Sequence, residues 1–117
     1  MREIKFRAWY GEKIGMLPPQ FNGDINEIFA AQNGVYMQYT GLKDKDGKEI
    51  YEGDIIEEGD IITEIVFKDL AWKEKLIYSP HNHLNSYFPL SQNTTRISLF
   101  GKVIGNIYEN PELLEDK

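Results

Sequence analysis

The stretch that decides the fold is Leu42-Lys43-Asp44-Lys45-Asp46-Gly47-Lys48-Glu49-Ile50-Tyr51-Glu52-Gly53-Asp54-Ile55-Ile56. Gly47 suits the left-handed position that closes a type I turn with a bulge, so Leu42 and Ile50 can face each other across a hairpin. Glu52-Gly53-Asp54 forms a second turn before an apolar pair. The stretch therefore predicts short antiparallel strands joined by tight turns, with positive φ at Gly47 and Gly53.

Apolar segments on both sides of this stretch also have the pattern of short strands between turns. The further strands that we expect span residues 3–9, 13–17, 35–39, 61–67, 72–78, 87–90, 96–100 and 102–108. The first two would form an N-terminal hairpin, and the strand at 87–90 would lie within a long polar loop over 79–92. This count predicts a mostly β protein, a small antiparallel barrel or sandwich.

Helix signals are few. Residues 24–32 favour a short helix, because apolar side chains fall at helical spacing behind a pattern similar to a capping box. The alternative there is a tight hairpin turn at Asn33-Gly34. Asn110-Pro111 has the residues of an N-cap and a first helical position, which predicts a short helix near the end of the chain. The sequence thus predicts at most one or two short helices.

Composition limits the possible functions. The chain has 117 residues, of which 41% are hydrophobic and 27% charged, as in a single soluble globular domain spanning residues 1–117. It has no cysteine, which excludes a thiolate nucleophile, disulfides and cysteine metal sites. Its longest apolar run, Ile28-Phe29-Ala30-Ala31, is far below the ~20 residues of a membrane span. Residues 1–7 lack the apolar region of a signal peptide, so we expect a cytoplasmic protein without membrane contact.

The formal net charge is −6, and the acidic residues are clustered. Eight of the 19 acids lie between residues 43 and 60: Asp44, Asp46, Glu49, Glu52, Asp54, Glu57, Glu58 and Asp60. A protein that binds DNA through its phosphates needs a basic face. The best candidate is Lys5 with Arg7, joined by Arg2, Lys13 and Lys102. A solvated strand face explains these residues as well, so the sequence disfavours nucleic acid as a partner.

Three separate stretches together resemble a known family. They are residues 1–9 (Met1-Arg2-Glu3-Ile4-Lys5-Phe6-Arg7-Ala8-Trp9), residues 38–56, and residues 103–114 (Val103-Ile104-Gly105-Asn106-Ile107-Tyr108-Glu109-Asn110-Pro111-Glu112-Leu113-Leu114). In this order they are similar to the YopX family, small proteins of bacteriophages and prophages. The resemblance implies an SH3-like barrel and a phage or prophage accessory protein of unknown molecular function. It transfers no catalytic or ligand residue, and the segment from Trp72 to Phe100 matches no family pattern.

Two motifs invite a metal-binding interpretation. Asp44-Lys45-Asp46-Gly47 resembles the middle of a calcium loop, but Leu42 and Gly53 occupy positions where that loop needs carboxylates. His81-Asn82-His83 could present two imidazoles, but a site needs a third ligand and the surrounding residues predict a loop.

The acids of residues 44–60 could also supply paired carboxylates for magnesium or for acid–base catalysis. We expect instead that most of them lie on turns facing water, because Gly-Asp pairs before Ile-Ile pairs fit turn chemistry. The sequence therefore predicts no catalytic residue, no metal site and no cofactor. A metal-dependent hydrolase that uses these acids with His81 and His83 is the alternative.

Aromatic residues are numerous: two Trp, seven Tyr and six Phe. They can fill a small barrel, anchor a protein interface or stack on bases. The candidate interaction surface comprises Lys5, Arg7, Trp9, Tyr39, Tyr51 and Tyr108. The sequence favours a non-catalytic protein-interaction module that binds an unknown protein or a second copy of itself. A nucleic-acid-binding β-barrel is an alternative, and residues 4–8 and 103–108 should lie close in space.

Overall fold

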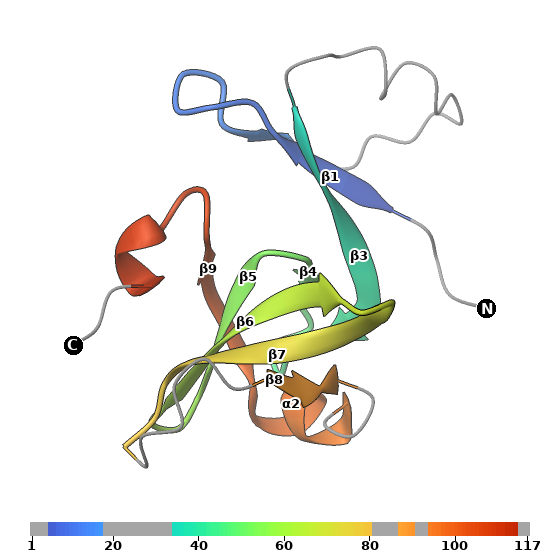
Figure 1. The fold of residues 1–117 in the computed structure, drawn as a ribbon, viewed down its shortest axis with the longest axis vertical. Coiled ribbons are helices and arrows are strands. Elements are labelled where there is room, and N and C mark those ends of the chain that lie inside the picture. Colours follow the sequence, from blue (N-terminus) through green and yellow to red (C-terminus); the bar gives the residue numbers. More distant parts are fainter. Residues whose placement is uncertain (1–4, 18–33, 81–86, 91–93, 115–117) are drawn as a thin grey trace.

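The computed structural model describes residues 5–17, 34–80, 87–90 and 94–114, and these form a mostly β structure (Figure 1). The strands are β1 (Phe6–Trp9), β2 (Met16–Leu17), β3 (Val35–Lys43), β4 (Glu49–Tyr51), β5 (Asp54–Glu58), β6 (Ile61–Lys68), β7 (Ala71–Tyr78), β8 (Tyr87–Pro89) and β9 (Lys102–Asn106). The helices are α2 (Thr94–Phe100) and the 3₁₀ helix η2 (Pro111–Leu114). The predicted mostly β, antiparallel fold class and the N-terminal hairpin are confirmed.

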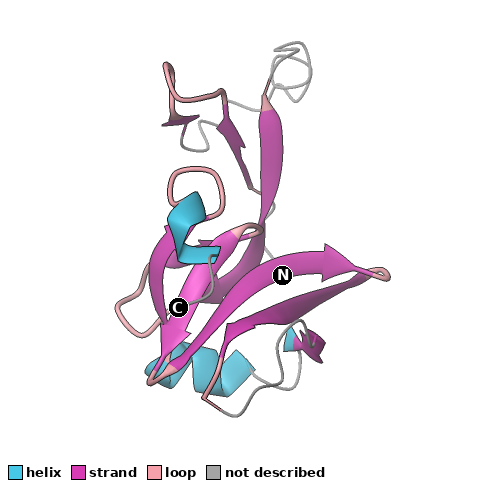
Figure 2. Ribbon diagram, turned by 60° about the vertical axis from the view of Figure 1, so that its left-hand side comes forward, coloured by secondary structure: helices cyan, strands magenta, loops and turns pink. Residues whose placement is uncertain are grey.

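The strands form two antiparallel sheets, one in the order β2-β1-β3-β4 and one in the order β8-β7-β6-β5-β9. The first half of β3 pairs with β1, and its later part pairs with β4. The β1–β2 hairpin consequently lies at one end of the molecule, while the five-stranded sheet curves into a half-barrel (Figure 2). The two sheets meet along β3, β4 and β5, and this junction positions the candidate site.

The core lies inside the half-barrel. Its buried side chains come from β4, β5, β6, β9, α2 and the residue after β8: Ile50, Ile56, Ile65, Leu90, Ile97 and Val103. Leu42 packs against this cluster, so Leu42 and Ile50 contribute to one core as the hairpin interpretation predicted. Burying each of these aliphatic side chains stabilises the fold by about 1.5–3 kcal/mol.

The prediction of a strand at residues 96–100 is wrong, because this segment belongs to helix α2. A strand would place Ile97 and Leu99 on the same face. In the helix, Ile97 is fully buried while Leu99 and Phe100 are exposed. Gly101 ends the helix, and its N–H donates to the Ile97 carbonyl. A Cβ at Gly101 would lie 2.9 Å from that carbonyl oxygen, so the tight turn into β9 requires glycine.

Both predicted glycine turns are confirmed. Gly47 has φ 82° and Gly53 has φ 86°. Gly53 also connects three segments, because its N–H donates to the Ile65 carbonyl and its own carbonyl accepts the N–H of Ile107. The turn after β4 is therefore attached to β6 and to the segment that follows β9.

β1 and the segment after β9 contact each other. β1 and β9 lie in different sheets, yet the rings of Trp9 and Tyr108 stack with their centroids 6.1 Å apart. Residues 24–32 and the motif His81-Asn82-His83 lie outside the described residues. No helix in the described part of the chain is long and apolar enough to cross a membrane.

Candidate functional site

The six residues of the predicted interaction surface lie together at the junction of the two sheets. Lys5, Arg7 and Trp9 alternate along one side of β1 and the residue before it. The Lys5 Nζ lies 5.2 Å from the centroid of the Tyr39 ring, and the Arg7 guanidinium carbon lies 4.8 Å from that of Tyr51. The two tyrosine rings are 5.4 Å apart, and Trp9 stacks on Tyr108. The structure thus brings all six into one region.

Not all six are accessible to a partner. Tyr39 and Tyr51 are only 6% and 5% exposed, whereas Lys5, Arg7, Trp9 and Tyr108 are half-buried. Burial raises the pKa of Tyr51 to about 12, and the neighbouring Glu49 carboxylate contributes. The two buried tyrosines therefore pack within the first sheet against Lys5 and Arg7, and the surface left for contact lies around Trp9 and Tyr108.

A buried ion pair crosses the junction. Arg7 Nη2 donates to Asp54 Oδ1 at 2.6 Å, and the two side chains are 11% and 1% exposed. The Tyr51 N–H donates to the other carboxylate oxygen at 2.8 Å. Burial raises the pKa of Asp54, while the attraction of Arg7 and this N–H oppose the shift. The buried Nε of Arg7 has no hydrogen-bond partner among the described atoms.

This pairing corrects the interpretation of Lys5 and Arg7 as a solvated strand face. Lys5 pairs with Glu49 on β4 of the first sheet, and Arg7 pairs with Asp54 on β5 of the second sheet. Each cation already has a carboxylate partner. Binding a phosphate here would require breaking these pairs, which is unfavourable for a buried charge.

Asp44 and Asp54 are exceptions to the expectation that most of the clustered acids lie on turns facing water, because both are buried. Asp44 Oδ1 accepts the N–H groups of Asp46 and Lys48, and Oδ2 accepts that of Val103, each at 2.9 Å. Burial alone would raise the pKa of Asp44, but these three N–H groups together lower it. Asp44 therefore fastens the β3–β4 hairpin to β9, and both of its oxygens are occupied.

The described residues contain no group of three or more His, Cys, Asp or Glu side chains that could hold a metal ion. His81 and His83 lie outside these residues. A polar cleft of about 440 Å³ does lie beside the ion pair. Arg7, Lys48, Asp54 and Glu109 are the charged residues that line it, so opposite charges are balanced there.

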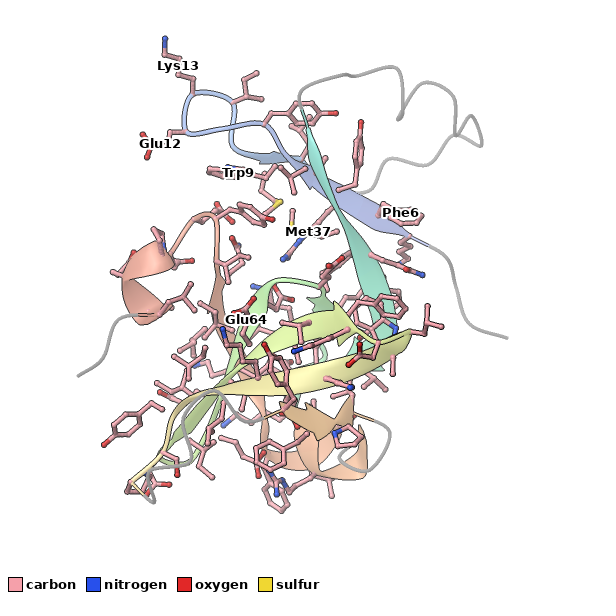
Figure 3. All side chains as sticks on the ribbon, viewed as in Figure 1. Phe6, Trp9, Glu12, Lys13, Met37 and Glu64 are labelled. Carbon is pink, nitrogen blue, oxygen red and sulfur yellow. The ribbon has the colours of Figure 1, made fainter. Side chains whose placement is uncertain are left out.

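A smaller cleft, of about 150 Å³, lies between β3 and β6. Tyr36 and Met37 line it from β3, Glu64 and Phe67 from β6, and Tyr108 and Glu52 from the connecting segments. Figure 3 shows Met37 and Glu64 on opposite sides of the space between the two strands. Burial raises the pKa of Glu64, and repulsion from Glu52 adds to the shift while Lys75 opposes it. We refer to this space as the β3–β6 cleft.

The tip of the β6–β7 hairpin carries an unusual residue. Asp69 and Leu70 have φ 54° and 63°, in the left-handed region that L-residues rarely adopt. The Leu70 side chain is 92% exposed. Phe67 is half exposed beside it, with its ring edge-on to Trp72 at 5.1 Å. The sequence analysis missed this tip, because no local pattern marks a leucine with positive φ.

The chain matches the YopX protein family over residues 19–115. It belongs to the YopX family. This match confirms the resemblance inferred from the three stretches. The chain is also similar in structure to protein EF1440 from Enterococcus faecalis, known from a crystal structure. That comparison gives 30% sequence identity and a TM-score of 0.64, and covers 98% of this chain and 100% of the other. No curated protein matches the chain.

The YopX family match covers one side of the junction, whereas Lys5, Arg7 and Trp9 precede the matched residues. The family match includes β3, β4, β5 and the segment after β9, which supply Tyr39, Tyr51, Asp54 and Tyr108. These residues form the side of the junction that faces β1. The Leu70 tip and both walls of the β3–β6 cleft also fall within the matched residues.

Proposed function

We propose that this YopX-family chain is a phage or prophage accessory protein that binds another protein and catalyses no reaction. It acts as one domain in the cytoplasm of the bacterial host. The family match supports a phage or prophage origin, because the resemblance to the YopX family implies small proteins of bacteriophages and prophages. The proposal for binding rests on the tip of the β6–β7 hairpin.

The observation that carries this proposal is the combination of strain and exposure at Leu70. A left-handed conformation costs an L-residue such as leucine about 1–2 kcal/mol, and glycine or asparagine would relieve most of it. A side chain that is 92% exposed buries almost no apolar surface, so it contributes almost nothing to the stability of the fold. Strained residues with no structural benefit concentrate at functional sites, and large apolar side chains are typical anchors in interfaces. Leu70 thus serves as an anchor for a partner's apolar pocket.

Affinity capture from phage-infected cells tests this proposal. Wild-type protein should retain a specific partner, and Leu70→Asn should lose it, because asparagine keeps the turn and removes the apolar anchor. Ile14→Asn is the matched control, since Ile14 is also exposed, at 64%, but lies on the β1–β2 hairpin. Equal capture by wild type and Leu70→Asn would contradict the proposal, as would the absence of any specific partner.

A further inference from the structure

The β3–β6 cleft has the chemistry of a receptor for a positively charged side chain. Two carboxylates, Glu52 and Glu64, line it together. Neither forms an ion pair or a side-chain hydrogen bond with another described residue. Lys75, the register partner of Glu64 on β7, attracts that carboxylate without forming an ion pair with it. The cleft therefore carries excess negative charge.

The rest of the lining is aromatic or apolar. Tyr36, Met37, Phe67 and Tyr108 line the same space. Aromatic faces attract cations, and planar guanidinium groups stack on them particularly well. Burial raises the pKa of the Tyr108 phenol, and the negative charges of Glu52 and Glu64 add to this shift while Arg7 opposes it. Carboxylates and rings thus favour the same kind of ligand.

The size of the cleft restricts its occupant. At about 150 Å³, it is below the range of roughly 300–1,000 Å³ that is typical of small-molecule sites. One long side chain fits such a volume, whereas a nucleotide does not. The position is also suitable for a contact made by a partner, because Phe67 lines the cleft and lies three residues from the anchor Leu70.

We propose that the β3–β6 cleft receives an arginine side chain from a basic segment of the partner protein. The guanidinium group lies between Glu52 and Glu64, and its plane packs on the tyrosine rings. This inference rests on the proposed function and specifies the chemistry of the partner. The net charge of −6 favours approach of a basic segment through long-range attraction.

Titration of the purified chain, followed by amide ¹H–¹⁵N spectra, tests this site without the partner. The probe is Nα-acetyl-arginine methylamide, and its control is the citrulline analogue, which has the same shape without charge. We expect the arginine probe to shift the amide signals of Gly53, Val66 and Tyr108 in a saturable way at concentrations up to roughly 10⁻² M, where weak single-side-chain binding is measurable. The citrulline analogue should leave these signals in place.

Variants then identify the groups responsible. Glu64→Gln and Glu52→Gln should each weaken arginine binding about tenfold, because each removes one charge-assisted contact. Glu57→Gln is the matched control, since Glu57 is an exposed acid on β5 outside the cleft. An unchanged spectrum away from the cleft shows that each variant is folded. No saturable shift, equal shifts from the citrulline analogue, or binding by both cleft variants as tight as that of the wild type would overturn the inference.

Two further titrations distinguish a protein side chain from a free polycation and the cleft from the Leu70 anchor. Spermidine represents a free polycation, and binding of spermidine without binding of the arginine probe would overturn the proposal of a protein side chain. Leu70→Asn should bind the arginine probe as wild type does. The titration can therefore fail while capture through Leu70 succeeds, or the reverse, so the two proposals are tested independently.

Discussion

Arg7 Nη2 lies 2.6 Å from Asp54 Oδ1, and this ion pair joins β1 of the first sheet to β5 of the second. The carboxylate is 1% exposed, so its charge depends on the guanidinium for compensation. Ion pairs of this kind are costly to break one partner at a time, because the remaining charge stays buried. The pair therefore fixes how the β1–β2 hairpin sits on the half-barrel.

Replacing Arg7 should destabilise the protein in a pH-dependent way. Arg7→Leu should lower the free energy of unfolding by about 3–5 kcal/mol at neutral pH, because it leaves the Asp54 carboxylate buried and uncompensated. Without Arg7 the pKa of Asp54 rises further above its unfolded value. Protonation of Asp54 then stabilises the folded variant. The difference in free energy of unfolding between wild type and Arg7→Leu should therefore shrink as the pH falls toward about 4 and grow as the pH rises. Urea denaturation at several pH values measures this, and a deficit independent of pH would contradict it.

The pKa of Asp44 is shifted in the opposite direction to that of Asp54. Its pKa is lowered in the folded state, so its stabilising contribution is present above its unfolded pKa and is lost as the pH falls through the folded value. Asp44→Asn should cost about 1–3 kcal/mol at neutral pH, because an amide cannot accept all three N–H groups. The difference between wild type and variant should narrow in acid. A variant as stable as wild type at neutral pH would show that these bonds contribute nothing.

Gly53 should tolerate no β-branched residue. Gly53→Val should lower the free energy of unfolding by about 1–3 kcal/mol, because φ 86° strains any side chain there. A Cβ at this position would lie 3.5 Å from the Met37 sulfur, which is an ordinary contact. The loss of stability therefore comes from backbone strain and not from steric crowding. Gly53→Asn should cost less, since asparagine enters this region more readily. Equal losses for the two variants would point to crowding instead.

Leu70 should be a residue whose removal improves stability. Leu70→Gly should raise the free energy of unfolding by about 1 kcal/mol, because glycine adopts φ 63° without strain and little burial is lost. Chemical denaturation of the two proteins measures the change. A clear loss of stability would mean that the leucine supports the fold, and the argument for a binding anchor would then fail.

Much of the fold was predictable because its determinants are local. Glycines at turns and alternating apolar residues defined most strands, and Gly47 and Gly53 have the predicted φ values. Helix α2 was missed because Ile97 and Leu99 alternate with polar residues, a pattern that also fits a strand. The short helix depends on tertiary contacts, since Ile97 is buried beneath β3 and the half-barrel.

The candidate site was predictable only in part. The six residues do gather at one junction, but the buried state of Tyr39 and Tyr51 depends on contacts between distant segments. The partner of Arg7 lies 47 residues away, and no local pattern identifies it. The β3–β6 cleft likewise combines residues from four separate segments of the chain. Leu70 could not be singled out from the sequence, because its positive φ is a property of the folded backbone.

Hydrogen exchange of the chain with and without its captured partner tests the central claim most directly. If the protein binds through the β6–β7 tip, the amides of residues 66–72 should become protected in the complex, together with those that border the β3–β6 cleft. Protection confined to the β1–β2 hairpin or to α2, with residues 66–72 exchanging as in the free protein, would contradict the account.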